Sequence, residues 1–257
     1  MAGESWNTAI TSIAPNEIRV RGYRIDELIG AVPFGSTVYL IVRGELPSEA
    51  VGRLVEAILV ASIDHGVTPP STLSVRNAAS TGAPLNAALA AGALAVNRHH
   101  GGAVEDCMRL LARGAQQVAG GATAAQAAAQ LIAEEKAAGR RLPGWGHRVH
   151  SDDPRSRRLL DLARSSGVAG AHVAVAEAIV GELAKGGKQV PLNVDGAIAA
   201  LLADLSFAPE LANGFFILAR TAGWMAHVAE ELAREKPMRR IDQGAADYDG
   251  PAPRSLS

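Results

Sequence analysis

Four short polar segments interrupt a mostly apolar, helical pattern and carry the residues that could do chemistry. Each segment places one or two titratable side chains beside a glycine or a turn: Asp64-His65-Gly66, His100-Gly101-Gly102, Gly146-His147-Arg148 and Asn193-Val194-Asp195. Helix ends expose unpaired backbone N–H or C=O groups, which can bind anions or orient an imidazole. A single histidine of this kind is usually structural, whereas four segments of the same design favour a functional site.

Two glycines precede His147 or lie beside it, and a predicted helix start follows it. Gly144 and Gly146 allow its backbone to bend sharply or to approach a ligand closely. Asp153-Pro154-Arg155 then predicts a helix start, with aspartate as the N-cap and proline at the first helical position. A histidine and an arginine are therefore expected close together.

A metal site is a competing interpretation, because histidine and aspartate are both metal ligands. No two histidines have HxxxH or HExxH spacing, and Cys107 is the only cysteine. A cysteine-rich zinc site and a disulfide framework are thus excluded, and no metal is expected.

Bulk composition narrows the class of protein. The chain has 257 residues, enough for a substantial core, and its formal net charge of −1 points to neither nucleic acid nor a membrane surface. No segment reaches the ~20 apolar residues of a membrane span. The N-terminus does not resemble a signal peptide, and one cysteine fits a reducing compartment. A cytoplasmic protein is expected.

Hydrophobic periodicity predicts an all-α chain apart from one β-hairpin over residues 7–22. Thr68-Pro69-Pro70-Ser71 is interpreted as a rigid loop. Residues 78–96 contain nine alanines, which suits a tight helix–helix or subunit interface or merely a buried helix. Residues 247–257 are expected to form a surface tail. Helices are predicted near residues 25–29, 37–43, 48–64, 84–96, 103–113, 123–138, 158–164, 169–183, 197–202 and 209–232.

Several ordered motifs resemble the citrate synthase superfamily and cover nearly the whole chain. They are Arg21–Leu28 (RGYxIeeL), Tyr39–Pro47 (YLLxxGeLP), His100–Gly102 (HGG), Gly144–Arg155 (GxGHRV…DPR), Asn193–Asp195 (NVD) and Ala219–His227 (ARxxGWxAH). The resemblance implies a single helical unit over residues 1–257, with a smaller helical subdomain at about 104–212.

The chain is shorter than a full-length citrate synthase. In this it resembles citryl-CoA lyase and the C-terminal module of ATP-citrate lyase. The Asp64-His65-Gly66 segment, the Asn193–Gly196 turn and Lys136 favour that short form, whereas His100 is typical of synthases. The direction of reaction therefore stays open.

The resemblance also implies roles for individual residues. Asp195 matches the base that removes a proton from acetyl-CoA, and His100 matches a neutral imidazole that donates to the enol oxygen. His147 matches the group that polarises and protonates the ketone of oxaloacetate, and His65 would hold the same substrate. Carboxylates need bidentate donors, and Arg155 and Arg220 match the family's positions for them. The resemblance implies a third arginine that acts in the partner subunit's site. We assign this role to Arg240, with Arg239 as the alternative.

Coenzyme A brings phosphate groups that need cations. The candidates are Lys136, Arg148, Lys185 and Lys188, together with the backbone at Gly144 and Gly146. For each lysine a solvated surface position is an equal alternative. The thioester is a substrate, so no permanently bound cofactor is expected, and the resemblance implies a homodimer or larger assembly.

The function predicted from the sequence is cleavage of citryl-CoA to acetyl-CoA and oxaloacetate. One alternative is a short citrate synthase, or a relative that uses another acyl-CoA. Another is a non-catalytic assembly or CoA-binding module, against which the set of His100, His147 and Asp195 argues.

Overall fold

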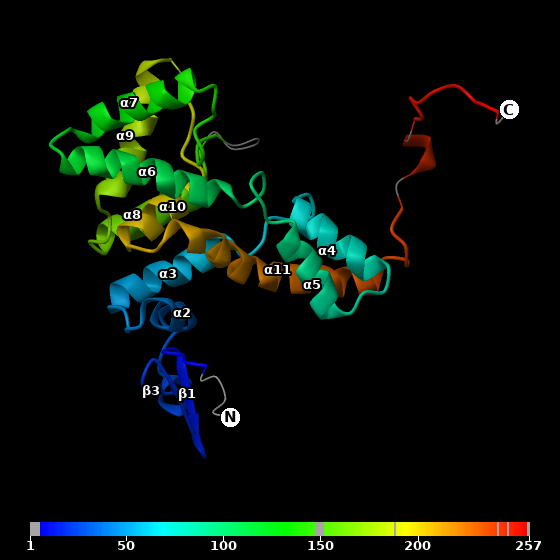
Figure 1. Ribbon diagram of the computed structural model, residues 1–257, viewed down its shortest axis with the longest axis horizontal. Coiled ribbons are helices and arrows are strands. Elements are labelled where there is room, and N and C mark those ends of the chain that lie inside the picture. Colours follow the sequence, from blue (N-terminus) through cyan, green and yellow to red (C-terminus); the bar gives the residue numbers. More distant parts are fainter. Residues whose placement is uncertain (1–5, 147–151, 188, 241, 246, 256–257) are drawn as a thin grey trace. The chain divides into compact units, whose positions relative to one another are not determined.

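The structure, a computed structural model, describes residues 6–146, 152–187, 189–240, 242–245 and 247–255. These residues form three short strands, eleven α-helices and two 3-10 helices, which confirms the predicted all-α class (Figure 1). The elements are β1 (Thr11–Ala14), β2 (Glu17–Val20), β3 (Tyr23–Arg24), α1 (Ile25–Leu28), α2 (Phe34–Arg43), α3 (Glu49–Ala61), α4 (Pro70–Ser80), α5 (Leu85–Leu94), α6 (Ala103–Ala119), α7 (Ala124–Ala137), α8 (Pro154–Ser165), α9 (Ala171–Lys185), α10 (Val194–Asp204), η1 (Pro209–Leu211), α11 (Ala212–Arg234) and η2 (Gln243–Ala245).

The predicted hairpin is present and carries a third strand. Strands β1, β2 and β3 pair antiparallel in that order, and Asn16 turns the chain between β1 and β2 with a φ of 62°. The guanidinium of Arg21 donates to the backbone oxygen of Ile41 at 3.0 and 2.7 Å, which ties the sheet to α2. The sheet has its own small core around Val20, Leu28 and Leu40.

Residues 1–65 and 96–223 form the first of two compact units. Helix α10 lies in its core, because residues 197–202 are all buried and apolar around the whole helix. Helices α6, α8 and α9 pack against α10, and α7 packs against α6 and α9. Helix α10, whose first turn carries Asp195, is therefore packed on several sides by helices of the same unit.

Residues 66–95 and 224–257 form the second unit. Helices α4 and α5 pack together, and the second half of α11 joins them through Trp224, whose indole donates to the Ser71 hydroxyl at 3.3 Å. A Cβ at Gly92 would overlap Val75 and Trp224, so glycine permits this close packing. The subdomain at about 104–212 lies within the first unit and stays a prediction.

Two sequence expectations about helix starts are wrong. The Pro69-Pro70 pair was interpreted as a loop, but Pro70 is the first residue of α4, where a missing N–H costs nothing. Helix α10 begins at Val194 instead of 197, so Asp195 lies inside its first turn. The cap expected at Asp153 is confirmed, and the side chains of Ser48 and Thr123 cap α3 and α7.

The described part of the 247–257 tail, residues 247–255, is exposed. No described helix combines the length and apolarity needed to cross a membrane.

Candidate functional site

The starts of α8 and α10 are joined by one buried carboxylate. Asp153 accepts hydrogen bonds from the Arg155 backbone N–H at 3.0 Å and from the Arg155 guanidinium at 3.0 and 2.9 Å. It also accepts from the backbone N–H of Val194 at 3.1 Å, and its side chain is fully buried. Arg155 and the neighbouring Asp195 are thereby held at one place, although 40 residues separate them in the sequence.

Replacing Asp153 by asparagine should lower the free energy of unfolding by about 2–3 kcal/mol, because an amide cannot accept from all of these donors. Burial raises the pKa of Asp153, but the hydrogen bonds and charge of Arg155 outweigh it and the net pKa is lowered. A lowered pKa adds stability above the ordinary carboxylate pKa, which is lost as the pH falls through the folded-state value. Urea titrations at several pH values should find this part of the pH dependence missing in the variant. The exposed Asp152→Asn is the control, and equal losses in both variants would contradict the assignment.

The glycine loop that precedes His147 lies directly against the start of α10. The backbone oxygen of Gly144 accepts from the Asn193 N–H at 3.0 Å, and the Asn193 amide donates to the Gly146 oxygen at 2.8 Å. Gly144 has a φ of 89°, and a Cβ on it would lie 2.7 Å from the Cα of Gly196. Glycine is therefore required at Gly144 by both conformation and space, as a close backbone approach predicts.

Asp195 is a partly buried carboxylate beside cationic groups. Burial raises its pKa above the ordinary aspartate value, while the charges of Arg155 and Arg220 oppose the rise. A raised pKa suits a group that must accept a proton near neutral pH.

Arg220 is the group that connects the candidate residues electrostatically. Its side chain is buried, with 4% of the residue exposed, and its guanidinium lies 4.5 Å from the ring centre of Phe216. Its Nε donates to the Ser62 oxygen at 2.8 Å, whereas its two terminal nitrogens donate no hydrogen bond within the described part of the chain. Burial lowers its pKa, against the charges of Asp64 and Asp195. A buried guanidinium with unused donors is suited to a carboxylate ligand.

His100 lies within the electrostatic reach of Arg220. Burial lowers the pKa of His100, and the positive charges of Arg220 and His65 lower it further. Its ring packs edge-on against Phe216, with ring centres 5.6 Å apart. The imidazole is therefore favoured in its neutral form at pH 7, in which one ring nitrogen carries a proton.

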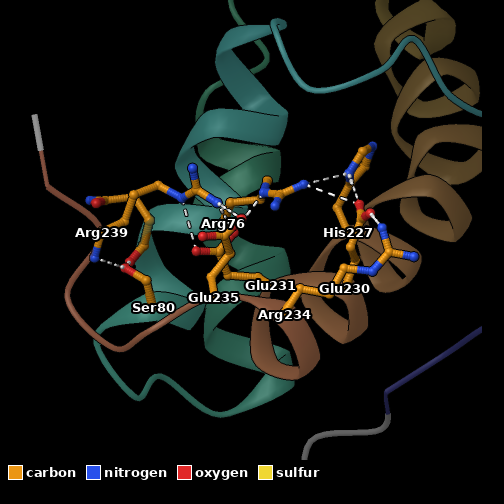
Figure 2. Close-up of polar contacts among 9 residues, drawn as sticks. Arg76, Ser80, His227, Glu230, Glu231, Arg234, Glu235 and Arg239 are labelled. Carbon is orange, nitrogen blue, oxygen red and sulfur yellow. Dashed lines mark hydrogen bonds and ion pairs between the residues drawn. The ribbon is translucent and has the colours of Figure 1, made fainter.

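The C-terminal arginines have different environments, and Figure 2 shows that of Arg239. Arg239 donates to both carboxylate oxygens of Glu231, at 2.9 and 2.6 Å, and its backbone N–H donates to the Ser80 hydroxyl at 3.3 Å. Arg240 is exposed and has no ion-pair partner among the described residues. Of the two candidates, Arg240 is thus the one whose guanidinium is available to a ligand.

The structure brings some sequence candidates together and leaves others apart. Asp195, Arg155, Arg220 and His100 share one electrostatic neighbourhood, and His65, which is exposed, affects the pKa of His100. Lys136 is exposed at the end of α7, and Lys185 is exposed and paired with Glu182 at 2.7 Å. His147, Arg148 and Lys188 lie outside the described residues.

Two neighbours of the site were given no role of their own from the sequence. Asp64 supplies an opposing charge to Arg220, and Phe216 contacts both Arg220 and His100. Asp64 could have been suspected because it precedes His65, but a core-like phenylalanine in an apolar helix carries no such signal. Among the described residues, no three His, Cys, Asp or Glu side chains lie close enough to hold a metal ion.

Comparisons with known proteins agree on one family. The model of the citrate synthase C-terminal domain matches residues 48–241. Putative citrate synthase 2 from Mycobacterium tuberculosis is 31% identical over 207 residues, which cover 78% of this chain and 52% of the relative. ATP-citrate synthase beta chain protein 1 from Arabidopsis thaliana is 26% identical over 205 residues, which cover 73% of this chain and 33% of the relative. The chain thus spans about half, or less, of the length of these curated relatives.

Solved structures extend the similarity over the whole chain. Citryl-CoA lyase from Hydrogenobacter thermophilus superposes with a TM-score of 0.89 at 41% identity, and the match covers 98% of this chain and 97% of that one. ATP citrate lyase from Methanosaeta concilii, solved with (3S)-citryl-CoA, superposes with a TM-score of 0.85 at 22% identity and covers 98% and 43%. At that lower identity the likeness concerns the fold alone.

Proposed function

The chain belongs to the citrate synthase family, and from this premise we propose that it cleaves citryl-CoA to acetyl-CoA and oxaloacetate. The observation that carries the proposal is the buried Arg220 beside Asp195 and His100, whose pKa values are shifted in opposite directions. A carboxylic acid with a raised pKa and an imidazole with a lowered pKa are the pair that enol chemistry at a thioester needs.

The proposed reaction proceeds by proton transfer in two places. His147 takes the proton of the citryl hydroxyl, the hydroxyl-bearing carbon becomes the ketone of oxaloacetate, and the adjacent C–C bond breaks. The electron pair of that bond passes to the thioester as the enolate of acetyl-CoA. Neutral His100 donates a hydrogen bond to the enolate oxygen, and Asp195 in its protonated form returns a proton to the carbon, which completes acetyl-CoA.

The carboxylates of the citryl group are assigned to arginines. Arg220 has two terminal nitrogens that bond to no described residue, and they lie in a buried position, where a charge-assisted hydrogen bond is strongest. Arg155 keeps one terminal nitrogen without a partner in the described chain, while Asp153 orients the rest of its guanidinium. His65 is a further proposed contact to the same substrate, and Arg240 is proposed as a third arginine that acts in the partner subunit's site.

CoA binding and assembly belong to the same proposal. Relatives of this fold have been solved with CoA and citrate or with citryl-CoA, and the cations proposed here for CoA are Lys136, Arg148, Lys185 and Lys188, with the backbone of Gly144 and Gly146. Exposed leucines on α4 and α5, Leu73, Leu85 and Leu94, support a homodimer formed through these helices. A cytoplasmic location is proposed because the single buried Cys107 needs no oxidising compartment.

The experiment that tests the proposed reaction is incubation with synthetic citryl-CoA. A lyase should release acetyl-CoA and oxaloacetate in equal amounts without free thiol. Oxaloacetate is followed with a coupled dehydrogenase, and thiol with a chromogenic disulfide. Release of free CoA thiol would instead identify a citrate synthase, since only the synthase hydrolyses the thioester. Absence of both products would contradict an enzymatic role and leave the non-catalytic module.

A further inference from the structure

The chain beyond α11 is attached to α4 at Met238 and Arg239. The Arg239 guanidinium donates to both carboxylate oxygens of Glu231, at 2.9 and 2.6 Å, and its backbone N–H donates to the Ser80 hydroxyl at 3.3 Å (Figure 2). The backbone N–H of Met238 donates to the backbone oxygen of Ser80 at 2.7 Å. We call these contacts of Met238 and Arg239 with Ser80 and Glu231 the C-terminal anchor. They hold both the main chain and the side chain of Arg239.

Glu231 is a fixed acceptor within the C-terminal anchor. Its side chain is 1% exposed, and Arg76 of α4, which is 8% exposed, donates to the same carboxylate at 2.7 Å. A carboxylate that accepts from two guanidinium groups keeps one orientation, so Arg239 is bound in a defined direction. Because apolar side chains of similar size often stabilise a protein as well as a buried ion pair does, the specific contribution of these charges is orientation.

The backbone at Met238 is a second sign of a constrained chain. Met238 has a φ of 61°, in the left-handed region that residues with a side chain rarely adopt. Such a conformation costs energy and persists only where surrounding contacts hold it, and it is found most often at functional sites. The hydrogen bond from Met238 to Ser80 is such a contact. The constraint therefore lies directly before Arg239 and Arg240.

Arg240 follows the C-terminal anchor and differs from Arg239 in its environment. It is exposed and has no ion-pair partner among the described residues. Consecutive Cα atoms are about 3.8 Å apart, so the backbone of Arg240 starts from a fixed point while its guanidinium stays available. An arginine on a fixed main chain loses less conformational entropy on binding a carboxylate than one on a flexible tail. The pair is therefore suited to holding one arginine and presenting the next.

We propose that Arg239 is a positioning residue, which presents the guanidinium of Arg240 to a carboxylate of the substrate in the partner subunit's site. This inference rests on the proposed function, which gives Arg240 that contact. It adds a role for a residue that does not touch the substrate, and it extends that role to Ser80 and Glu231, which hold Arg239.

The test is a double-mutant cycle between Arg239→Gln and Arg240→Gln in the full chain. Steady-state kinetics follow cleavage of citryl-CoA, and calorimetry measures binding of oxaloacetate, which needs no turnover. Ser80→Ala weakens the anchor in a second way, because it removes the acceptor of the Arg239 backbone N–H and leaves every charge in place. Arg234→Gln, which removes an exposed arginine of α11 paired with Glu230, is the matched control. The midpoint of urea unfolding shows that each variant is folded, and Ser80→Ala carries the same cycle if Arg239→Gln is not.

Arg239→Gln should raise KM for citryl-CoA and weaken oxaloacetate binding about tenfold. The value of kcat should change by less than about twofold, because a carboxylate contact away from the reacting bond stabilises the ground and transition states alike. Ser80→Ala should act in the same direction by a smaller factor. In the Arg240→Gln background neither substitution should weaken binding further, since the group that they position is absent. Arg234→Gln should leave KM and oxaloacetate binding unchanged.

Three results would overturn the proposal. Equal losses from Arg239→Gln with and without Arg240 would leave the anchor a structural contact only. Unchanged oxaloacetate binding in folded Arg239→Gln and Ser80→Ala would show that the anchor does not affect the ligand, and unchanged binding in Arg240→Gln would show that Arg240 does not bind it. If the wild type forms no acetyl-CoA from citryl-CoA while oxaloacetate binding follows the expected cycle, the proposed reaction fails and the positioning role stands.

Discussion

Replacing Asp195 by asparagine is expected to lower turnover of citryl-CoA by about 10²–10⁴-fold. The amide keeps the shape of the side chain but can neither carry the proton to the enolate carbon nor remove it in the reverse direction. Binding of the dicarboxylate product should be largely retained, because Arg155 and Arg220 remain. Rapid-quench measurement of acetyl-CoA formation, with oxaloacetate binding measured by calorimetry, checks both statements.

The same substitution should not destabilise the protein. Burial raises the pKa of Asp195, so the folded state disfavours its ionised form. A raised carboxyl pKa means that this group costs stability as the pH rises from the ordinary aspartate value through the folded-state value. At neutral pH, Asp195→Asn should therefore leave the midpoint of urea unfolding unchanged or raise it. Loss of activity combined with unchanged or increased stability separates a catalytic group from a structural one.

The pH profile supplies an independent check of Asp195. In the reverse direction Asp195 must remove a proton, so it has to be ionised. The acid limb of the pH–rate profile for that direction should therefore lie above the ordinary carboxylate pKa. Asp161→Asn, an exposed acid on α8, should change neither the profile nor turnover. Retention of activity in Asp195→Asn would remove Asp195 from the proton-transferring role, whatever its position.

Local signals in the sequence were sufficient for much of the scaffold. Ser48, Thr123 and Asp153 cap helices as their residue types predict, because these side chains satisfy backbone N–H groups within three residues. The apolar period located most helices within a few residues. Helix α4 was missed because Pro69-Pro70 resembles a loop, although proline at the first position of a helix is itself a local start signal.

The site depends on contacts that no local pattern encodes. Asp153 was predicted as a helix cap, but its hydrogen bond to Val194 spans 41 residues. Arg220 donates to Ser62 across 158 residues, and this contact sets where its guanidinium lies. Residue types and motifs indicated which groups matter, whereas their burial and mutual charge, which set the pKa values of Asp195 and His100, follow from the tertiary fold.

The second unit contains a buried cluster of ion pairs that the hydrophobic periodicity of the sequence does not indicate. Arg76 donates to Glu231 at 2.7 Å and to Glu230 at 3.2 Å, although 155 residues separate Arg76 from Glu231 (Figure 2). The Arg76 and Glu231 side chains are 8% and 1% exposed. The residue types near the end of α11 do not indicate that Glu231 is among the most buried side chains of the described residues.

Glu231→Ala is expected to lower the free energy of unfolding by about 3–5 kcal/mol, because it leaves the buried Arg76 guanidinium without its main partner. Arg239 loses both of its bonds to Glu231 but is 40% exposed, so water can replace them at little cost. Urea unfolding followed by circular dichroism measures the loss. The backbone N–H groups of Met238 and Arg239, which donate to Ser80, should also exchange faster with solvent.

Two further variants separate the buried pair from surface charge. Glu235→Gln removes a half-exposed partner of Arg239 and should cost no more than about 0.5–1 kcal/mol. The double variant Arg76→Met, Glu231→Leu should recover most of the loss, since apolar side chains of similar size remove the unpaired charge. Failure of the double variant to recover would mean that the pair is needed for packing rather than for charge.

The pH dependence of this cluster has a defined sign. The hydrogen bonds from Arg239 lower the pKa of Glu231 below its ordinary value, and Arg76 lowers it further, against the effect of burial. The stabilisation is therefore complete above the ordinary glutamate pKa and is lost as the pH falls through the folded-state value. Wild type should lose stability on acidification over this range more steeply than Glu231→Ala. Parallel stability curves for the two proteins would contradict an ionised Glu231 in the folded state and would require another explanation for the binding of residues 238–239 to α4.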